Sequence, residues 1–282
     1  MPSNQFGAPE PPRGGQEGGV VKLIPGSYKR FEAPAGMQDV AELYESKFDI
    51  KFETLHFFSH TLLHDLHRLD DHAELPPEIE ITSGKDASII EDINVLSDIA
   101  NNTPDDLARR AVYFETLKTI YGKLASTPSD VTHDPDMLFL GIEREGRALA
   151  EAMGWLPRGH NCHPHAKRIP YEGGLLVGVT EIEDLDAYFK CVIIDGAIAS
   201  GATVISVIQK VRPFISSHRV YSVHSTLEGL HAINRYCTST GLDLRLTVGH
   251  ATQGLNKKFY AVALPNTKML VVGDIGDTIS DL

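Results

Sequence analysis

Cysteine is scarce in this sequence, which holds three among 282 residues, at positions 162, 191 and 237. Small domains that depend on disulfides carry more cysteines at closer spacing. The three thiols are too few and too scattered for such a framework. Because 42% of the residues are hydrophobic, the chain can instead bury a sizeable core.

Long apolar runs and an excess of positive charge are also missing. No apolar run approaches the length of a membrane span, and the N-terminal residues lack the apolar core of a signal peptide. The net charge of −12 argues against non-specific nucleic-acid binding, which relies on a basic surface. We therefore expect a cytoplasmic protein that binds neither membrane nor nucleic acid. An anionic ligand would need local cations, for which the best supply is Arg144, Arg147, Arg158, Lys167 and Arg168.

The N-terminal part of the chain divides into two regions. Residues 1–20 are rich in glycine and proline with almost nothing to bury, which predicts a flexible tail. Residues 21–88 are predicted to form an added, mainly helical region. Within it, residues 40–70 are predicted to be helical because one stripe repeats at helical spacing: Leu55, Phe58, Leu62, Leu66 and Leu69.

Residues 89–282 alternate between strand-like and helix-like patterns and are predicted to form one domain. Short apolar runs lie at 137–142, 175–180, 191–194, 220–225, 245–249 and 269–272. Helical spacing is found at 87–99, 105–124, 146–153, 203–211 and 227–240. This alternation predicts an α/β fold, with a mainly parallel sheet flanked by helices.

The segment from Lys190 to Lys210, KCVIIDGAIASGATVISVIQK, has the order of a phosphate-binding turn. An apolar strand ends at Asp195, and the small residues 199–203 then lead into an apolar helical run. A helix that begins in such a loop points free N–H groups and its positive dipole end at a ligand. Gly201 would let the backbone approach that ligand closely. An ordinary strand-to-helix turn is the alternative reading.

Two familiar phosphate motifs are excluded, since the loop lacks the Gly-Lys-Ser/Thr ending of a Walker A sequence and the glycine spacing of a dinucleotide fingerprint. The loop instead resembles the phosphoribosyl diphosphate (PRPP) loop of type I phosphoribosyltransferases. It is most similar to the uracil phosphoribosyltransferase branch, in which a single acid precedes Ala-Thr-Gly-Gly-Thr or Ser. Asp195-Gly-Ala-Ile-Ala-Ser-Gly-Ala-Thr203 fits that pattern, with Ser200 and Ala202 as departures.

Two further segments carry the same resemblance in the same order. The residues from Met269 to Asp277, MLVVGDIGD, are similar to the Gly-Asp-Ala-Gly-Asp segment that lines the base and ribose site in that branch. The residues from Leu138 to Gly146, LFLGIEREG, are similar to the strand and loop whose Ile-Leu-Arg-Ala-Gly sequence faces the diphosphate. The resemblance extends over residues 90–282.

The resemblance implies transfer of a phosphoribosyl group from PRPP to a small heterocyclic acceptor, with Mg²⁺ as cofactor and a homodimer as the assembly. Asp195 would hold the ribose and Arg144 the departing diphosphate. The 5-phosphate would be bound by Ala199, Ser200, Gly201, Ala202 and Thr203. The acceptor and ribose would be bound by Gly273, Asp274, Gly276 and Asp277. A surface ion pair of Arg144 and a solvated Asp-Gly turn at 273–277 are the alternatives.

Some residues depart from the family pattern. Ser97 stands where the family's early arginine is expected, Glu145 replaces a small residue, and the chain ends at Leu282 without the family's final Phe-Gly-Thr. A carboxylate at position 145 would either repel diphosphate or recruit magnesium. A non-catalytic homologue that binds PRPP or a nucleotide is therefore the alternative function.

Histidine is grouped in two places. His56, His60, His64 and His67 would share one face of the predicted helix, and His160, His163 and His165 form a second group. Such spacing can bind a transition metal, which makes a metal-dependent hydrolase a third hypothesis. Because no cysteine or carboxylate accompanies the row at fixed spacing, a polar helix flank or a subunit contact is favoured, and we predict no resident metal there.

Overall fold

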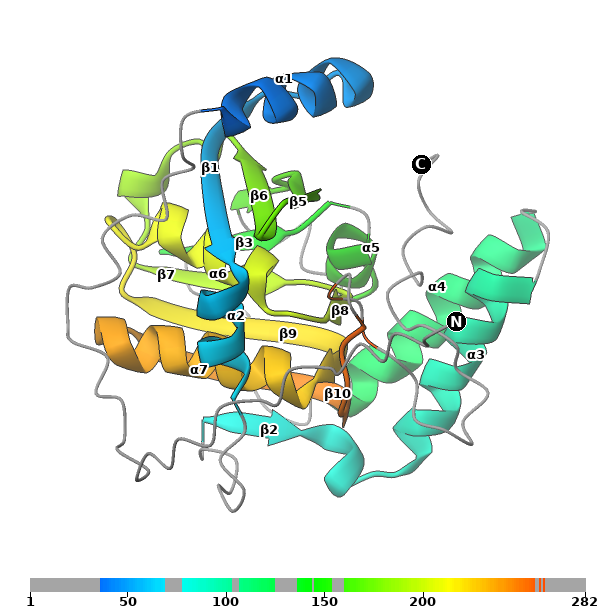
Figure 1. The fold of residues 1–282 in the computed structure, drawn as a ribbon. Coiled ribbons are helices and arrows are strands. Elements are labelled where there is room, and N and C mark those ends of the chain that lie inside the picture. The colour runs from blue at the N-terminus through cyan, green and yellow to red at the C-terminus, as the bar shows by residue number, and fades with distance from the viewer. Residues whose placement is uncertain are drawn as a thin grey trace, which may run out of the picture.

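The computed structural model describes residues 36–68, 78–102, 107–124, 136–143, 145–153, 160–256, 259 and 261. Its main sheet runs in the order β2-β10-β9-β7-β3-β4, and β8 pairs with β9 (Figure 1). Every strand pair recorded in this sheet is parallel. The strands are β2 (Ile79–Ile81), β3 (Met137–Gly141), β4 (His160–Cys162), β7 (Lys190–Ile194), β8 (Ala197–Ile198), β9 (Ser217–Thr226) and β10 (Asp243–Thr252).

Helices cover both faces of the main sheet (Figure 1). The helices are α3 (Ser88–Asn102), α4 (Leu107–Leu124), α5 (Glu145–Ala152), α6 (Ala202–Val211) and α7 (Leu227–Thr240). In β3, Leu138 and Leu140 pack in the core that contains α6 and α7, whereas Met137 and Phe139 pack in the core that contains α3, α4 and α5. Both faces of β3 are therefore apolar, as expected for a buried parallel strand. The predicted α/β fold is confirmed.

A smaller antiparallel sheet contains β1 (Phe52–Ser59), β6 (Gly174–Thr180) and β5 (Ala166–Tyr171), in the order β1-β6-β5. The run at 175–180 was expected among the parallel strands, but it forms β6 of this second sheet. The run at 269–272 lies outside the described residues, as does the predicted tail at 1–20. The other four predicted strands and all five predicted helices are present in the main domain.

The continuous helix predicted over residues 40–70 is wrong. The described residues of this segment form helix α1 (Met37–Phe48), strand β1 and helix α2 (His60–His67), so a strand interrupts the predicted helix. The reason lies in β6, whose glycines leave room for β1. A Cβ at Gly174 would lie 2.2 Å from the Phe58 carbonyl oxygen, and one at Gly178 would lie 2.6 Å from the Phe52 ring. The pairing of β1 with β6 prevails over the helical spacing, and no residue within 40–70 indicates that pairing.

The strand order places two loops at a topological switch point. From β3 the chain moves to β4 on one side, and it then returns through β7, β9 and β10 on the other side. In open α/β sheets, ligands bind at the carboxyl ends of the strands where the order reverses. The loops after β3 and β7 meet at this position.

All three cysteines are free thiols, which confirms that no disulfide framework holds the fold. Among the described residues, no helix combines the length and the apolar character needed to cross a membrane.

We predict that Gly174→Ala destabilises the protein, because the added methyl group would force β1 away from β6. The free energy of unfolding should fall by about 1–3 kcal/mol in urea denaturation. Gly122→Ala is the control, since a Cβ at Gly122 in α4 meets nothing within 4 Å. This variant should be neutral or more stable by up to about 1 kcal/mol. Equal losses in both variants would contradict the close contact between the strands.

Candidate functional site

A pocket lies at the switch point, between the loop after β3, the loop after β7 and strand β5. Its cavity volume is about 60 Å³, the space of roughly two water molecules. Most of its wall comes from the segment that joins β7 to α6 together with the first turn of α6. The lining residues are Ile142, Glu143, Ala166, Lys167, Arg168, Asp195, Ala197, Ile198, Ala199, Ser200, Gly201, Thr203, Val204 and Ala261.

Several carbonyl oxygens of the β7–α6 loop accept hydrogen bonds from β9, so they point away from this pocket. Three hydroxyl groups donate to them: Ser222 to Gly196 (3.0 Å), Ser225 to Ile198 (3.2 Å) and Thr226 to Ala199 (2.6 Å). The Gly196 oxygen also accepts bonds from the Val223 and His224 N–H groups. Hydroxyl residues in a strand as buried as β9 are the sequence signal for this arrangement, and sequence reasoning missed it.

A side chain of helix α2 bonds to the next carbonyl group of the loop, that of Ser200. His67 Nε2 lies 2.8 Å from the Ser200 oxygen. Because a carbonyl oxygen only accepts, Nε2 must carry the proton. Burial lowers the pKa of His67, so the ring is neutral near pH 7. The N-terminal region therefore contacts the loop directly, a role for His67 that its sequence context did not indicate.

Because these carbonyl groups point toward β9 and α2, the opposite side of the loop is the side on which its N–H groups lie. Helix α6 begins at Ala202, and the first N–H groups of a helix have no intrahelical acceptor. The Ala202 N–H donates to Ser200 Oγ at 3.3 Å. The helix dipole adds positive potential at the same place. The loop is therefore suited to bind an anion of phosphate size.

Two glycines allow the loop to pack on α7. Gly201 has φ +76°, and a Cβ there would lie 2.8 Å from the Gly229 carbonyl oxygen. A Cβ at Gly229 would lie 2.3 Å from the Ala199 oxygen. A side chain at Gly201 would therefore strike α7, whereas the backbone of Gly201 lines the pocket, and its approach to a ligand stays a prediction. Of the other residues predicted for the phosphate, Ala199, Ser200 and Thr203 line the pocket, and Ala202 is buried beside it.

Charged side chains of both signs line the rest of the pocket. Asp195 follows β7, and its N–H donates to the Tyr221 oxygen at 3.1 Å. Glu143 follows β3, and its Oε1 atom lies 3.6 Å from Arg147 Nη1. Lys167 and Arg168 approach from β5, and Arg168 Nη1 donates to the Phe259 oxygen at 3.4 Å. Sequence reasoning identified Asp195 as a site residue and the two cations as a local supply, but it missed Glu143.

Several predicted site residues lie outside the described part of the chain. They are Arg144, Gly273, Asp274, Gly276 and Asp277, and their roles stay predictions. The neighbouring Gly146 is described, and a Cβ there would lie 2.1 Å from the Ile194 oxygen. The start of α5 therefore packs directly on the end of β7. This contact brings the two loops of the switch point together.

A second pocket of about 420 Å³ lies beside the loop, on the side of α2. It is lined by His60, His64, His67, Arg68, Glu228, Leu255, Asn256 and Phe259. Glu228 Oε1 accepts a bond from the Gly254 N–H at 2.9 Å, and its Oε2 atom is buried without a hydrogen-bond partner in the described structure. The His60 and His67 rings lie 5.7 and 6.3 Å from the Phe259 ring.

The predicted row of four histidines is divided between two elements. His56 lies in β1, whereas His60, His64 and His67 lie in α2. Within the described ranges, no group of three or more histidine, cysteine or acidic residues has the arrangement to hold a metal ion. The hypothesis of a metal-dependent hydrolase is not favoured by this arrangement.

Comparisons with known proteins concern the fold. No family model matches the chain, and no curated protein is similar to it in sequence. The AQ2163 protein from Aquifex aeolicus has a similar structure, with a TM-score of 0.54 and 16% identity over 72% of this chain and 97% of that one. An adenine phosphoribosyltransferase from Trypanosoma brucei aligns with a TM-score of 0.42 and 14% identity, over 64% of this chain and 86% of that one. The AQ2163 comparison supports the α/β fold alone.

We predict that Thr226→Val loosens the candidate loop. Thr226 Oγ1 donates to the Ala199 oxygen and accepts from the Gly229 N–H, so the variant loses a loop bond and the N-cap of α7. The free energy of unfolding should fall by about 1–3 kcal/mol in urea denaturation. Thr119→Val, at an exposed position of α4, should change it by less than about 0.5 kcal/mol. A similar small effect at Thr226 would contradict the importance of its two bonds.

We also predict that acid weakens the fold through His224, which lies behind the loop. Burial lowers the pKa of His224 from 6.5 to about 3. As the pH falls below about 6.5, the unfolded chain gains a proton that the folded chain does not, so stability is lost at about 1.4 kcal/mol per pH unit. Urea denaturation at about pH 7 and pH 5 should show a smaller loss in His224→Gln than in the wild type. An unchanged pH dependence would contradict this assignment.

Proposed function

We propose that this protein transfers the 5-phosphoribosyl group from PRPP to uracil or a related small heterocycle, with release of diphosphate. The observation that carries the proposal is the bonding of the loop carbonyl groups of Gly196, Ile198, Ala199 and Ser200 to β9 and α2. This bonding leaves an amide surface at the start of α6. The same loop carries the sequence resemblance to PRPP loops, so geometry and sequence favour the same ligand.

In this proposal the parts of the pocket have different tasks. The N–H groups of Ala199, Ser200, Gly201 and Thr203 bind the 5-phosphate, with the hydroxyls of Ser200 and Thr203 as further donors. The Ala202 N–H donates to Ser200 Oγ and helps to fix this side chain. Asp195 accepts hydrogen bonds from the ribose hydroxyls. The cations Arg144, Lys167 and Arg168 bind the diphosphate, because a fixed positive group stabilises the charge that develops on a leaving group.

The chemistry of transfer is a substitution at the C1 atom of the ribose. A ring nitrogen of the acceptor forms a bond to C1 while the bond from C1 to the diphosphate oxygen breaks and its electron pair leaves with diphosphate. The ring nitrogen then passes its proton to a water molecule. Glu143 and Asp195 supply the carboxylate oxygens that Mg²⁺ prefers, and the ion would neutralise charge on the diphosphate. The site residues therefore fit the implied cofactor.

We place the acceptor beside the loop, toward the pocket on the α2 side. His67 and Phe259 connect the two spaces, because His67 bonds to Ser200 and Phe259 bonds to Arg168. The Phe259 ring offers an apolar face, and the buried Glu228 Oε2 atom can accept a bond from a ring N–H. The contacts proposed for Gly273, Asp274, Gly276 and Asp277 would complete this side. A homodimer remains part of the proposal.

A non-catalytic homologue that binds PRPP or a nucleotide is the second candidate. Glu143 favours it, since this carboxylate lines the pocket next to the proposed phosphate positions and would repel a polyanion without magnesium. The two candidates differ in one measurable product. Binding of PRPP with release of diphosphate on an added heterocycle supports the transferase, whereas binding without release on any acceptor supports the homologue.

We predict that Asp195→Asn weakens binding of PRPP with Mg²⁺ by about tenfold in calorimetric titration, because it removes a charge at the ribose while keeping the size. Asp243→Asn is the matched control. Asp243 is exposed at the amino-terminal end of β10, whereas Asp195 follows the carboxyl end of β7, so this variant should bind PRPP as the wild type does. Chelation of magnesium should lower the affinity of the wild type. Equal affinity of all three proteins for PRPP would refute the role of Asp195.

A further inference from the structure

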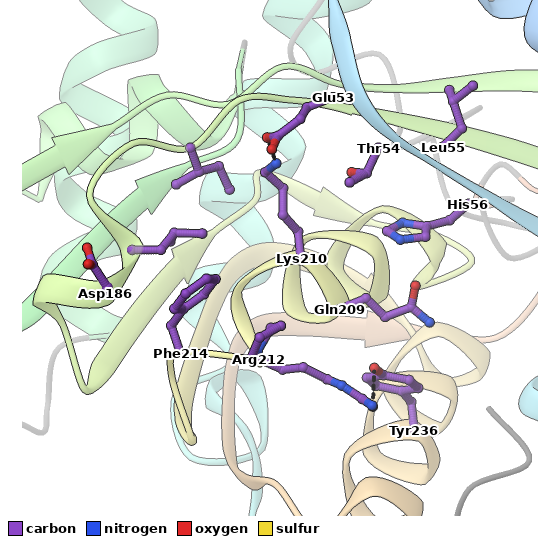
Figure 2. A pocket seen from close by; sticks show the side chains of 13 residues that line it. Glu53, Thr54, Leu55, His56, Asp186, Gln209, Lys210, Arg212, Phe214 and Tyr236 are labelled. Carbon is purple, nitrogen blue, oxygen red and sulfur yellow. Dashed lines mark hydrogen bonds and ion pairs between the residues drawn. The ribbon is translucent and has the colours of Figure 1, made fainter. Parts of the chain in front are cut away.

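A larger cavity, of about 810 Å³, lies at the other end of α6 (Figure 2). It is lined by β1, the segment after β6, the C-terminal end of α6 with the segment that follows it, and one residue of α7. Because α6 has ten residues, this end lies about 15 Å from the phosphate loop. The lining residues are Glu53, Thr54, Leu55, His56, Ile182, Leu185, Asp186, Gln209, Lys210, Arg212, Pro213, Phe214 and Tyr236.

The charges that line this cavity are balanced. Lys210 forms an ion pair with Glu53, and Arg212 Nη1 donates to the Tyr236 hydroxyl at 3.2 Å (Figure 2). The negative charges of two carboxylates, Glu53 and Asp186, balance the positive charges of Lys210 and Arg212. The cavity therefore has little net charge and does not favour a polyanion such as PRPP. Its occupant should be uncharged where it meets the wall.

Three lining residues hold buried polar atoms with unused hydrogen-bonding capacity. They are Thr54 Oγ1, His56 Nδ1 and Gln209 Oε1, and none has a hydrogen-bond partner in the described structure. Burial lowers the pKa of His56 to about 4, so its ring is neutral near pH 7. A hydroxyl, a neutral imidazole and an amide are matched by a ligand that carries uncharged donors and acceptors.

The remaining wall is apolar and includes an exposed aromatic ring. Phe214 is 50% exposed, and Ile182, Leu185 and Pro213 line the same cavity. An exposed ring at the mouth of a pocket can stack on a flat ligand. The volume lies within the range of about 300–1,000 Å³ that is usual for small-molecule sites. A planar molecule with polar edges matches both parts of the wall.

We propose that this cavity binds a neutral, planar, hydrogen-bonding heterocycle of nucleoside size, at a site separate from the phosphate loop. The ring stacks on Phe214, and its polar edge bonds to Gln209 and His56. This site is additional to the proposed transfer of a phosphoribosyl group. Its binding test needs no transfer, so the two proposals can fail separately.

The test is calorimetric titration of adenosine, guanosine, cytidine and uridine into the full-length chain. We expect saturable binding of at least one nucleoside. The Gln209→Leu variant removes the amide at similar size, and Phe214→Ala removes the exposed ring, so each should weaken that binding by about tenfold. Gln38→Leu, the same substitution on the exposed side of α1, should leave the affinity unchanged. Because Phe214 is half exposed, its variant remains informative if Gln209→Leu does not fold.

A variant of the phosphate loop separates the two sites. Thr203→Ala should leave nucleoside affinity unchanged, because Thr203 lines the small pocket at the start of α6. The proposal is overturned if no nucleoside saturates the protein up to about 10 mM. It is also overturned if Thr203→Ala weakens nucleoside binding while Gln209→Leu and Phe214→Ala do not, since the ligand would then occupy the transfer site.

Discussion

The candidate site depends on the way β9 and α2 hold the carbonyl groups of one loop. Ser222, Ser225 and Thr226 donate to the carbonyl oxygens of Gly196, Ile198 and Ala199, and His67 donates to that of Ser200. A loop without these partners would keep its carbonyl dipoles free to turn toward a ligand, and a phosphate would be repelled. The hydroxyl groups of β9 and the His67 ring therefore keep these carbonyl dipoles from opposing the positive end of the α6 dipole.

The same contacts connect the site to the rest of the fold. Gly201 and Gly229 let the loop lie directly on α7, and Gly146 lets α5 begin against the end of β7. These close contacts bring two carboxylates into one pocket: Glu143, which follows β3, and Asp195, which follows β7. Helix α2 belongs to the N-terminal region, so this region contributes to the site through His67 and also supplies β1 to the smaller sheet. Residues far apart in sequence thus determine the geometry of a short motif.

Local patterns in the sequence predicted most of the main domain. The apolar runs of β3, β7, β9 and β10 and the helical spacing of α3 to α7 depend on neighbours in the chain. The loop from Asp195 to Thr203 could be interpreted as a candidate phosphate-binding turn because its pattern also consists of neighbours in the chain. Contacts between distant segments were not predictable: the helix expected over 40–70 contains β1 because Gly174 and Gly178 of β6 receive it. The bond from His67 to Ser200 spans 133 positions, and no local pattern reveals it. The roles of Arg144 and of residues 273–277 remain predictions from resemblance.

The central claim is that the N–H groups at the start of α6 bind a phosphate monoester. The most direct measurement is a titration of ribose 5-phosphate into ¹⁵N-labelled protein, followed by the amide signals of Ser200, Gly201 and Thr203 in NMR spectra. The account predicts saturable downfield shifts of these amide protons, with smaller changes at the C-terminal end of α6. Unchanged loop signals, while amides elsewhere respond to the same ligand, would contradict it.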